Sequence, residues 1–311
     1  MRLIQLNKTD NSFDGIHLFS GGLDSLISYF VLKDLGFNPL PIYFETPFFS
    51  SEKAKDIAEK NGIKLSVENV FNDYLSILKK PVYGYGKNLN PCIDCKAFMI
   101  NKAIDIAIKE GLKYVSTGEV FNQRPMSQTF QGMKKIEKLL KRKDLLVRPL
   151  SGEILKGKLE TNTIFKDKKL LSIEGRKREI QFKLAKKYNI KYFSSPSGGC
   201  LLTYKEYSEK IRILLDSNIK DERYFKMVKH CRLIKFNNSL AFIGRDKEDN
   251  EVLISLSKRD NVYQITDRKG PVGIFLGDDE KDFQNFLKKM LFYSKRDTTL
   301  PHLIEKIGDG A

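Results

Sequence analysis

The stretch Ser20-Gly21-Gly22-Leu23-Asp24-Ser25 constrains the fold of this chain more than any other. It lies between two apolar runs, residues 16–19 and 26–32, a pattern that predicts a strand, a glycine-rich turn and a helix. Adjacent glycines allow a tight turn and close approach to a ligand, and the N–H groups of such a turn and of the following helix favour an anion. The alternative is an ordinary turn in which Asp24 and Ser25 cap the helix.

Asp24 adds a carboxylate to this turn. Phosphate oxygens together with a carboxylate are typical ligands of Mg²⁺, so the sequence predicts a magnesium ion between Asp24 and bound phosphates. The loop is not a Walker A sequence, because the chain contains no G-x-x-x-x-G-K-[ST].

The first half of the chain alternates short apolar runs with helical patterns. We expect further strands at residues 41–44, 63–70 and 114–117, and helices at 51–62 and 100–111. Such alternation predicts an α/β fold with a parallel sheet and helices on both faces. Ligands of that architecture bind at the carboxyl ends of the strands.

Two of these expectations name individual side chains. Ser51 is expected to cap the helix at 51–62. The helix at 100–111 is expected to bury one apolar stripe, made of Ile100, Ala103, Ile104, Ala107 and Ile108.

The pattern changes near residue 204. Short β-type runs and a helical segment predict a smaller α+β C-terminal domain, so we place the domains at residues 1–204 and 205–311. The runs are 240–243, 262–265 and 272–276, and the helix is 282–293.

The composition is that of an ordinary globular protein, with 41% hydrophobic and 30% charged residues. The sequence has neither an apolar run of about 18 residues nor a signal-peptide pattern at its start, so we expect a cytoplasmic protein without membrane contact. The formal net charge of +16 indicates either a polyanionic partner such as nucleic acid or a lysine-rich solvated surface. The same two interpretations apply to the basic clusters at 134–135, 138, 141–143 and 166–169.

The chain has four cysteines, Cys92, Cys95, Cys200 and Cys231, and in a cytosolic protein these are more often metal ligands or reactive thiols than disulfides. Cys92 and Cys95 form a C-x-x-C at an expected helix start, where thiolates gain stability. Three interpretations remain open. They are a [4Fe–4S] cluster on Cys92, Cys95 and Cys200 with one iron unligated by protein, a persulfide carried between Cys95 and Cys200, and a zinc site completed by Cys231 or His230. Cys231 alone is more often a buried small apolar residue.

Three segments together resemble the tRNA thiouridine synthetases. Residues 20–25 look like the loop of PP-loop ATP pyrophosphatases, and residues 90–96 look like the N-P-C-x-x-C motif of the 2-thiouridylases. Residues 116–129, with Gly-x-x-x-x-Gln and Ser-Gln-Thr elements, resemble the 4-thiouridine synthetases, as does the run 148–150. The resemblance extends over roughly residues 12 to 204 and implies an adenine nucleotide alpha hydrolase-like fold.

This resemblance implies an ATP site and a sulfur site. The loop residues Ser20 to Ser25 would bind ATP and Mg²⁺, Phe44 would contact adenine, and Gly118 would line the same pocket. Cys95 and Cys200 match the two catalytic cysteines of the family, and Asp24 would be a third catalytic residue. Cys92 stands where persulfide-type enzymes carry Asp, which favours the [4Fe–4S] cluster.

The C-terminal part resembles the NFACT-R (DUF814) RNA-binding domain. The similarity lies in residues 242–253, with their G-[KR]-x-x-x-x-N spacing, and in the later D-x-x-G of residues 267–270. The other interpretation is a β-rich scaffold with charged turns.

The sequence therefore predicts ATP-dependent tRNA thiolation, in which a uridine carbonyl oxygen is adenylated and replaced by sulfur. The partners would be tRNA and a sulfur donor, either sulfide or a persulfide derived from a cysteine desulfurase. A PP-loop amidase or ligase for a small molecule would explain the loop but not the cysteines or the charge. A non-enzymatic RNA-binding protein would explain the charge but not the loop.

Overall fold

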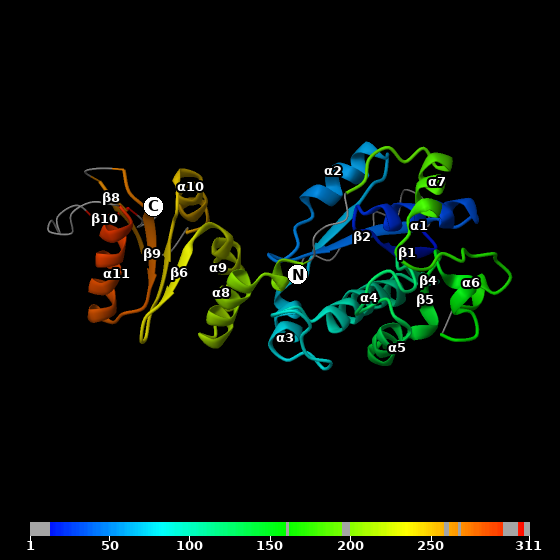
Figure 1. The fold of residues 1–311 in the computed structure, drawn as a ribbon, viewed down its shortest axis with the longest axis horizontal. Coiled ribbons are helices and arrows are strands. Elements are labelled where there is room, and N and C mark those ends of the chain that lie inside the picture. Colours follow the sequence, from blue (N-terminus) through cyan, green and yellow to red (C-terminus); the bar gives the residue numbers. More distant parts are fainter. Residues whose placement is uncertain are drawn as a thin grey trace. The chain divides into compact units, whose positions relative to one another are not determined.

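The computed structural model describes residues 13–159, 162–194, 200–257, 261–266, 269–294 and 304–307. The chain divides into two compact units, Met1–Thr203 and Tyr204–Ala311 (Figure 1). Each unit has a sheet of its own.

Unit 1 is built on a parallel sheet with the strand order β3-β2-β1-β4-β5. The strands are β1 (Gly15–Leu18), β2 (Pro39–Glu45), β3 (Ser66–Asn69), β4 (Tyr114–Thr117) and β5 (Leu146–Val147). Leu18 at the end of β1 is in register with Ile42 and with Thr117. The loops that follow β1, β2 and β4 therefore leave the same edge of the sheet, where ligands of such folds bind.

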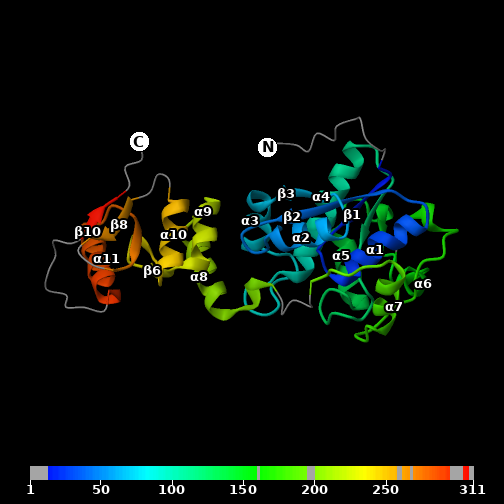
Figure 2. The same ribbon diagram turned by 90° about the horizontal axis from the view of Figure 1, so that it is seen from above.

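Helices cover both faces of this sheet, as predicted. They are α1 (Leu23–Asp34), α2 (Glu52–Lys60), α3 (Phe71–Lys79), α4 (Cys92–Lys109), α5 (Phe130–Leu139), α6 (Gly152–Leu155) and α7 (Glu179–Lys187), with 3₁₀ turns η1 (Lys143–Leu145), η2 (Thr163–Phe165) and η3 (Leu201–Thr203). Helices α1, α2 and α7 share one apolar core, and α4 and α5 share another on the opposite face (Figures 1 and 2). Burial of both faces explains why β1, β2 and β5 are apolar along most of their length, whereas the edge strand β3 is polar and only partly buried.

Helix α4 begins at Cys92, as expected, and continues without a break into the helix expected at 100–111. Two details differ from the expectations. The stripe of α4 is buried from Ile100 to Ala107, but Ile108 is 52% exposed because it lies off the buried face in the last turn. Ser51 precedes α2 but does not cap it, because its hydroxyl donates instead to the carboxylate of Glu45 at the end of β2.

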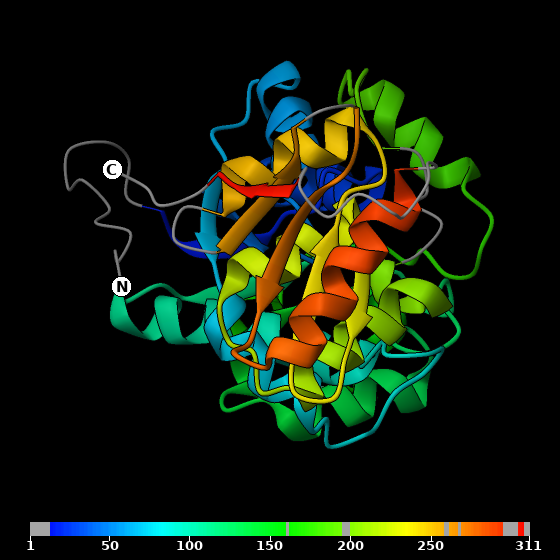
Figure 3. The ribbon, with the colours of Figure 1, turned by 90° about the vertical axis from the view of Figure 1, so that its left-hand side faces the viewer.

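Unit 2 contains an antiparallel sheet with the order β10-β8-β9-β7-β6, which confirms a separate α+β region. Its elements are α8 (Lys205–Asp216), α9 (Glu222–Met227), η4 (Val228–His230), β6 (Arg232–Lys235), β7 (Leu240–Ile243), α10 (Lys247–Leu256), β8 (Asn261–Ile265), β9 (Val272–Leu276), α11 (Glu280–Tyr293) and β10 (Ile304–Lys306). Helix α11 lies against one face of the sheet (Figure 3), where Phe286 and Met290 share a core with Phe275. On the other face the ring of Tyr224 lies 5.3 Å from that of Phe242.

Candidate functional site

The loop at residues 20–25 is held closed by its two serines. Gly21 has a φ of +72°, a conformation that favours glycine, and Gly22 is the residue before α1. The hydroxyl of Ser25 donates to the carbonyl of Gly22 at 2.9 Å and accepts from the amide of Ser20 at 3.2 Å. Helix α1 has no side-chain cap, so the alternative in which Asp24 and Ser25 serve as caps is wrong. The Asp24 carboxylate, in the first turn, remains available for other partners.

A buried histidine supports the loop from behind. Nε2 of His17 donates to the carbonyl of Ser25 at 2.8 Å, and Nδ1 lies 2.8 Å from the hydroxyl of Ser116 on β4. Burial lowers the pKa of His17 to about 4, although the hydrogen bond to Ser25 acts in the opposite direction. His17 is therefore neutral at pH 7 and links β1, the start of α1 and β4 without adding charge.

The carboxylate of Asp24 lies between two polar side chains from distant segments. Its Oδ2 accepts from Nε2 of Gln123 at 3.1 Å, and its Oδ1 lies 3.9 Å from Nη2 of Arg178, the residue before α7. Oδ1 of Asp24, Oε1 of Gln123 and Nε of Arg178 are buried and have no hydrogen-bond partner among the described residues. Buried polar atoms are normally satisfied, so this unsatisfied trio indicates a place where a polar ligand completes the structure.

Gly118 connects β4 to the same loop. A Cβ atom at Gly118 would lie 2.7 Å from Cα and N of Ser25. Only glycine lets the end of β4 approach the first turn of α1 this closely. Its predicted place beside ATP remains a prediction.

Two other predicted ATP residues belong to the apolar core. Leu23 is 1% exposed and packs among the α1 and α2 residues, and Phe44 is 5% exposed and packs among those of α4. Their contacts with ATP also remain predictions, and little of either side chain is accessible to a ligand.

Contacts of the segment around Pro91 bring the three cysteines of unit 1 near one another. Cys92 begins α4 and Cys95 follows one turn later, with its amide donating to the carbonyl of Pro91 at 2.7 Å. The segment that starts at Cys200 is fixed to residues just before Pro91. The amide of Leu89 donates to the carbonyl of Leu202 at 3.1 Å, and Asn88 donates to that of Thr203 at 2.7 Å.

The thiols affect one another's protonation. Burial raises the pKa of Cys95 to about 12, with Cys200 and Cys92 acting in the same direction and the Tyr74 hydroxyl opposing them. The pKa of Cys200 is raised by burial and by Cys92. The expectation that the helix start would stabilise a Cys95 thiolate is therefore wrong, because removal from water outweighs it. Among the described residues, no group of three His, Cys, Asp or Glu side chains is arranged to hold a metal ion.

Cys231 lies in unit 2 and is fully buried, as expected of a small apolar residue. Burial raises the pKa of its thiol to about 12. The neighbouring His230 is engaged with Asp249, whose Oδ1 lies 3.2 Å from His230 Nδ1. These contacts give Cys231 and His230 structural roles within unit 2.

Sequence reasoning missed a buried chain of charges next to the cysteines. Glu119 pairs with Lys96 at 2.8 Å and with Arg148 at 3.0 Å, and Arg148 reaches Glu137 on α5 at 2.6 Å. Burial acts to raise the pKa of Glu119, but the pairs with Lys96 and Arg148 lower it to about 2. Since Lys96 follows Cys95 and Glu119 follows Gly118, this chain connects the cysteine helix to the edge of the sheet that carries the loop.

Residues 11–161 match the model of a protein family described as thiamine biosynthesis protein (ThiI). The match includes the loop, Cys92 and Cys95, whereas Arg178 and Cys200 lie beyond it. Together with the parallel sheet flanked by helices, it confirms the expected PP-loop α/β fold for unit 1.

Two of the curated relatives that this chain resembles are named as tRNA-specific 2-thiouridylases. The tRNA-specific 2-thiouridylase MnmA 2 of Fusobacterium nucleatum is 30% identical over 146 residues, which cover 44% of this chain and 42% of that protein. The tRNA-specific 2-thiouridylase MnmA of Helicobacter acinonychis is 34% identical over 113 residues, or 32% of each chain. The chain thus spans less than half the length of these relatives.

A solved 4-thiouridine synthetase in complex with RNA and bound ATP is 23% identical, with a TM-score of 0.37. The likeness covers 56% of this chain and 50% of that one. Among the described residues, no helix is long and apolar enough to cross a membrane.

Proposed function

We propose that this chain is an ATP-dependent tRNA sulfurtransferase. The observation that carries the proposal is the arrangement around Asp24, where a carboxylate, an amide and a guanidinium with unsatisfied polar atoms surround a glycine-rich loop at a helix N-terminus. The relatives named as 2-thiouridylases and the match to the ThiI family support the choice of substrate and reaction.

The loop would bind the phosphates of ATP. Residues 20–25 offer amides at the start of α1 to the anion. The Asp24 carboxylate, whose Oδ1 accepts no hydrogen bond from the described residues, suits Mg²⁺ as a hard oxygen ligand. When bound, Mg²⁺ would neutralise charge on the triphosphate. Arg178 adds a fixed positive charge beside the same carboxylate, and Gln123 fixes its orientation.

The reaction would proceed in two displacements. A uridine carbonyl oxygen attacks the α-phosphorus of ATP, the bond to the bridging oxygen breaks, and pyrophosphate leaves. Sulfide, or the terminal sulfur of a persulfide, then forms a bond to the activated ring carbon, and AMP leaves with the former carbonyl oxygen. In the persulfide route the second cysteine then attacks the carrier cysteine sulfur, and thiouridine is released as a Cys95–Cys200 disulfide forms. The target base must leave its stack to reach these groups.

Sulfur would be held by the cysteines beside Tyr74. The proposed cluster ligands are Cys92, Cys95 and Cys200, and the mutual effect of these thiols on their pKa values supports a shared site. Such a cluster would supply a site for sulfide. The described thiols do not form a metal-holding group as they stand, so a persulfide on Cys95 or Cys200 is the other route. Both routes require Cys95 and Cys200, but only the cluster requires Cys92.

Substitution of Asp24 tests the ATP site. Asp24→Asn should abolish tRNA-dependent release of pyrophosphate, because the amide cannot carry the negative charge that the site provides. Asp34→Asn is the matched control, since Asp34 ends the same helix and is exposed in a pair with Lys187. Equal pyrophosphate release from wild type and Asp24→Asn would refute the assignment.

Substitution of Cys92 separates the two sulfur routes. If the protein carries a cluster, anaerobically purified wild type should contain iron and sulfide, and Cys92→Ala should lose both together with thiolation. Full thiolation by iron-free protein or by Cys92→Ala would favour the persulfide.

Unit 2 is proposed as an RNA-binding domain of the NFACT-R type. The resemblance rests on Gly244 and Asn250 and on the D-x-x-G of residues 267–270, of which 267 and 268 lie outside the described residues. The observed contacts of Gly244 and Asn250 are internal. Asn250 Oδ1 accepts from the amide of Val272 at 3.0 Å, its Nδ2 donates to Gly270 at 3.2 Å, and a Cβ at Gly244 would lie 2.0 Å from Oδ1. These residues join α10 to β7 and β9, so RNA contacts would come from surface residues around them.

A further inference from the structure

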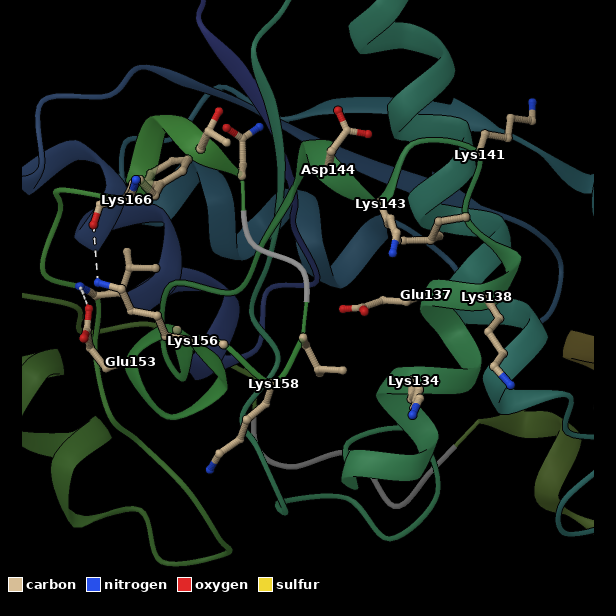
Figure 4. A pocket seen from close by; sticks show the side chains of 18 residues that line it. Lys134, Glu137, Lys138, Lys141, Lys143, Asp144, Glu153, Lys156, Lys158 and Lys166 are labelled. Carbon is tan, nitrogen blue, oxygen red and sulfur yellow. Dashed lines mark hydrogen bonds between the residues drawn. The ribbon is translucent and has the colours of Figure 1, made fainter.

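A cavity of about 1020 Å³ opens in unit 1 on the side of β5, among α5, η1, α6 and η2. Figure 4 shows the lysine side chains that surround it, on helix α5 and on the segment after α6. We call it the lysine pocket and define it by five exposed lysines, Lys134, Lys138, Lys156, Lys158 and Lys166. Two basic clusters that lie apart in the sequence therefore meet at one concave surface.

The acidic residues of the pocket are already engaged by other groups. Glu137 is bound by Arg148 at 2.6 Å, and Asp144 is bound by Arg142 at 2.7 Å. Glu153 accepts a hydrogen bond from the amide of Leu170 at 3.1 Å. Seven lysines and these three carboxylates are among the described residues that line the pocket, so positive charge is in excess there.

The lysines, by contrast, retain their charge for a ligand. Among the described residues, no carboxylate pairs with Lys138, Lys158 or Lys166. Lys134 lies over the ring of Phe130, and Lys156 donates to the carbonyl of Lys166 at 3.3 Å. Five ammonium groups on flexible stems around one cavity attract a ligand with several negative charges.

The chemistry of the pocket favours nucleic acid over a protein. Lysine is depleted in protein–protein interfaces and enriched where proteins meet nucleic acid. Phe165, the aromatic residue among the described lining residues, is buried at 2% exposure, so the lining itself offers no exposed ring for stacking with unpaired bases. Lysines without stacking rings suit the phosphate backbone of a duplex region.

We infer that the lysine pocket binds the backbone phosphates of a base-paired region of RNA, as a docking site separate from the loop at residues 20–25. This inference takes its choice of RNA from the proposed function, but it concerns binding and requires no thiolation. Lysine contacts with phosphates would add affinity with little sequence preference and would weaken as salt rises.

The test is binding of an unmodified tRNA transcript to the full chain, without ATP, over a range of salt concentrations. In the pocket variant Lys138, Lys158 and Lys166 are changed to Gln. Loss of three phosphate contacts should weaken binding about 10- to 100-fold at low salt and reduce the slope of log K against log salt by about 2 to 3. A duplex RNA competitor should displace the tRNA more effectively than unpaired RNA of the same length.

The control variant carries the same change of charge elsewhere on unit 1. Lys33, Lys64 and Lys109 are exposed and do not line the pocket, and changing all three to Gln should leave affinity and slope close to wild type. Circular dichroism and urea midpoints establish that both variants fold.

Equal losses in the two triple variants would overturn the inference, because general surface charge would then explain binding. Unchanged RNA affinity in the pocket variant would also overturn it. The test measures RNA affinity and no reaction. Its result therefore decides whether the lysine pocket binds RNA even if the protein does not thiolate tRNA.

Discussion

Gln123 donates a hydrogen bond from Nε2 to Oδ2 of Asp24 at 3.1 Å across 99 residues of sequence. This contact joins the loop after β4 to the first turn of α1. It holds one carboxylate oxygen, while the other faces Arg178. The orientation of the key carboxylate of the ATP site therefore depends on residues outside the glycine-rich loop.

Gln123→Leu should reduce pyrophosphate release about 10- to 100-fold, the usual cost of removing a group that orients a ligand. Leu keeps most of the side-chain volume but cannot donate to Asp24. Steady-state kinetics with tRNA and varied ATP would measure the effect, and Gln123→Glu should be worse still because it adds a like charge. Kinetics equal to wild type in Gln123→Leu would show that Gln123 does not orient Asp24.

His17 should make stability fall as the pH falls below neutral. The pKa of His17 is about 4 in the folded protein, below the ordinary histidine value of 6.5, so between these values the unfolded chain binds a proton that the folded chain excludes. The free energy of unfolding should drop by roughly 3 kcal/mol over that window from this group alone. Urea titrations of wild type and His17→Gln at several pH values measure the difference. Parallel pH curves for the two proteins would contradict the prediction.

Glu119→Gln should destabilise the protein by about 3 to 5 kcal/mol, because it removes the buried negative charge between Lys96 and Arg148 and leaves Arg148 paired with Glu137 alone among the described residues. The stabilisation by Glu119 should be complete above about pH 4.5 and decline as the pH falls toward its folded pKa of about 2. The control is Asp144→Asn, which breaks an exposed pair with Arg142 and should cost less than about 1 kcal/mol. Similar urea midpoints for the two variants would argue against a structural role for the buried charges.

Removal of residues 205–311 should weaken binding of tRNA and reduce its salt dependence, if unit 2 supplies RNA contacts. Unit 1 has apolar cores of its own, so the shortened chain can be examined for folding by circular dichroism. Filter binding of tRNA at several salt concentrations provides the measurement. An unchanged affinity and slope would locate all RNA binding in unit 1.

Features fixed by local sequence were predictable. The strand, turn and helix around residues 20–25 follow from adjacent glycines between apolar runs, and the helix start at Cys92 follows from a proline before an amphipathic stretch. The parallel sheet followed from the alternation of strands and helices.

Features that depend on contacts between distant segments were not predictable. The positions of Gln123 and Arg178 beside Asp24 arise only when β4 and α7 pack against α1. The raised pKa of Cys95 has the same origin, because the local effect of a helix start is overcome by burial beside Tyr74. Nor does sequence show that the basic clusters near residues 138 and 166 surround one cavity.

The central claim is tested most directly by mass spectrometry of tRNA nucleosides after incubation with the anaerobically purified protein, ATP and either sulfide or a cysteine desulfurase with cysteine as the sulfur donor. Our account predicts that thiouridine forms only when ATP is present, that Cys95→Ala and Cys200→Ala abolish it, and that Cys231→Ala, whose thiol is buried in unit 2, retains it. Absence of thiouridine from tRNA in reactions where a small molecule alone stimulates pyrophosphate release would contradict the account.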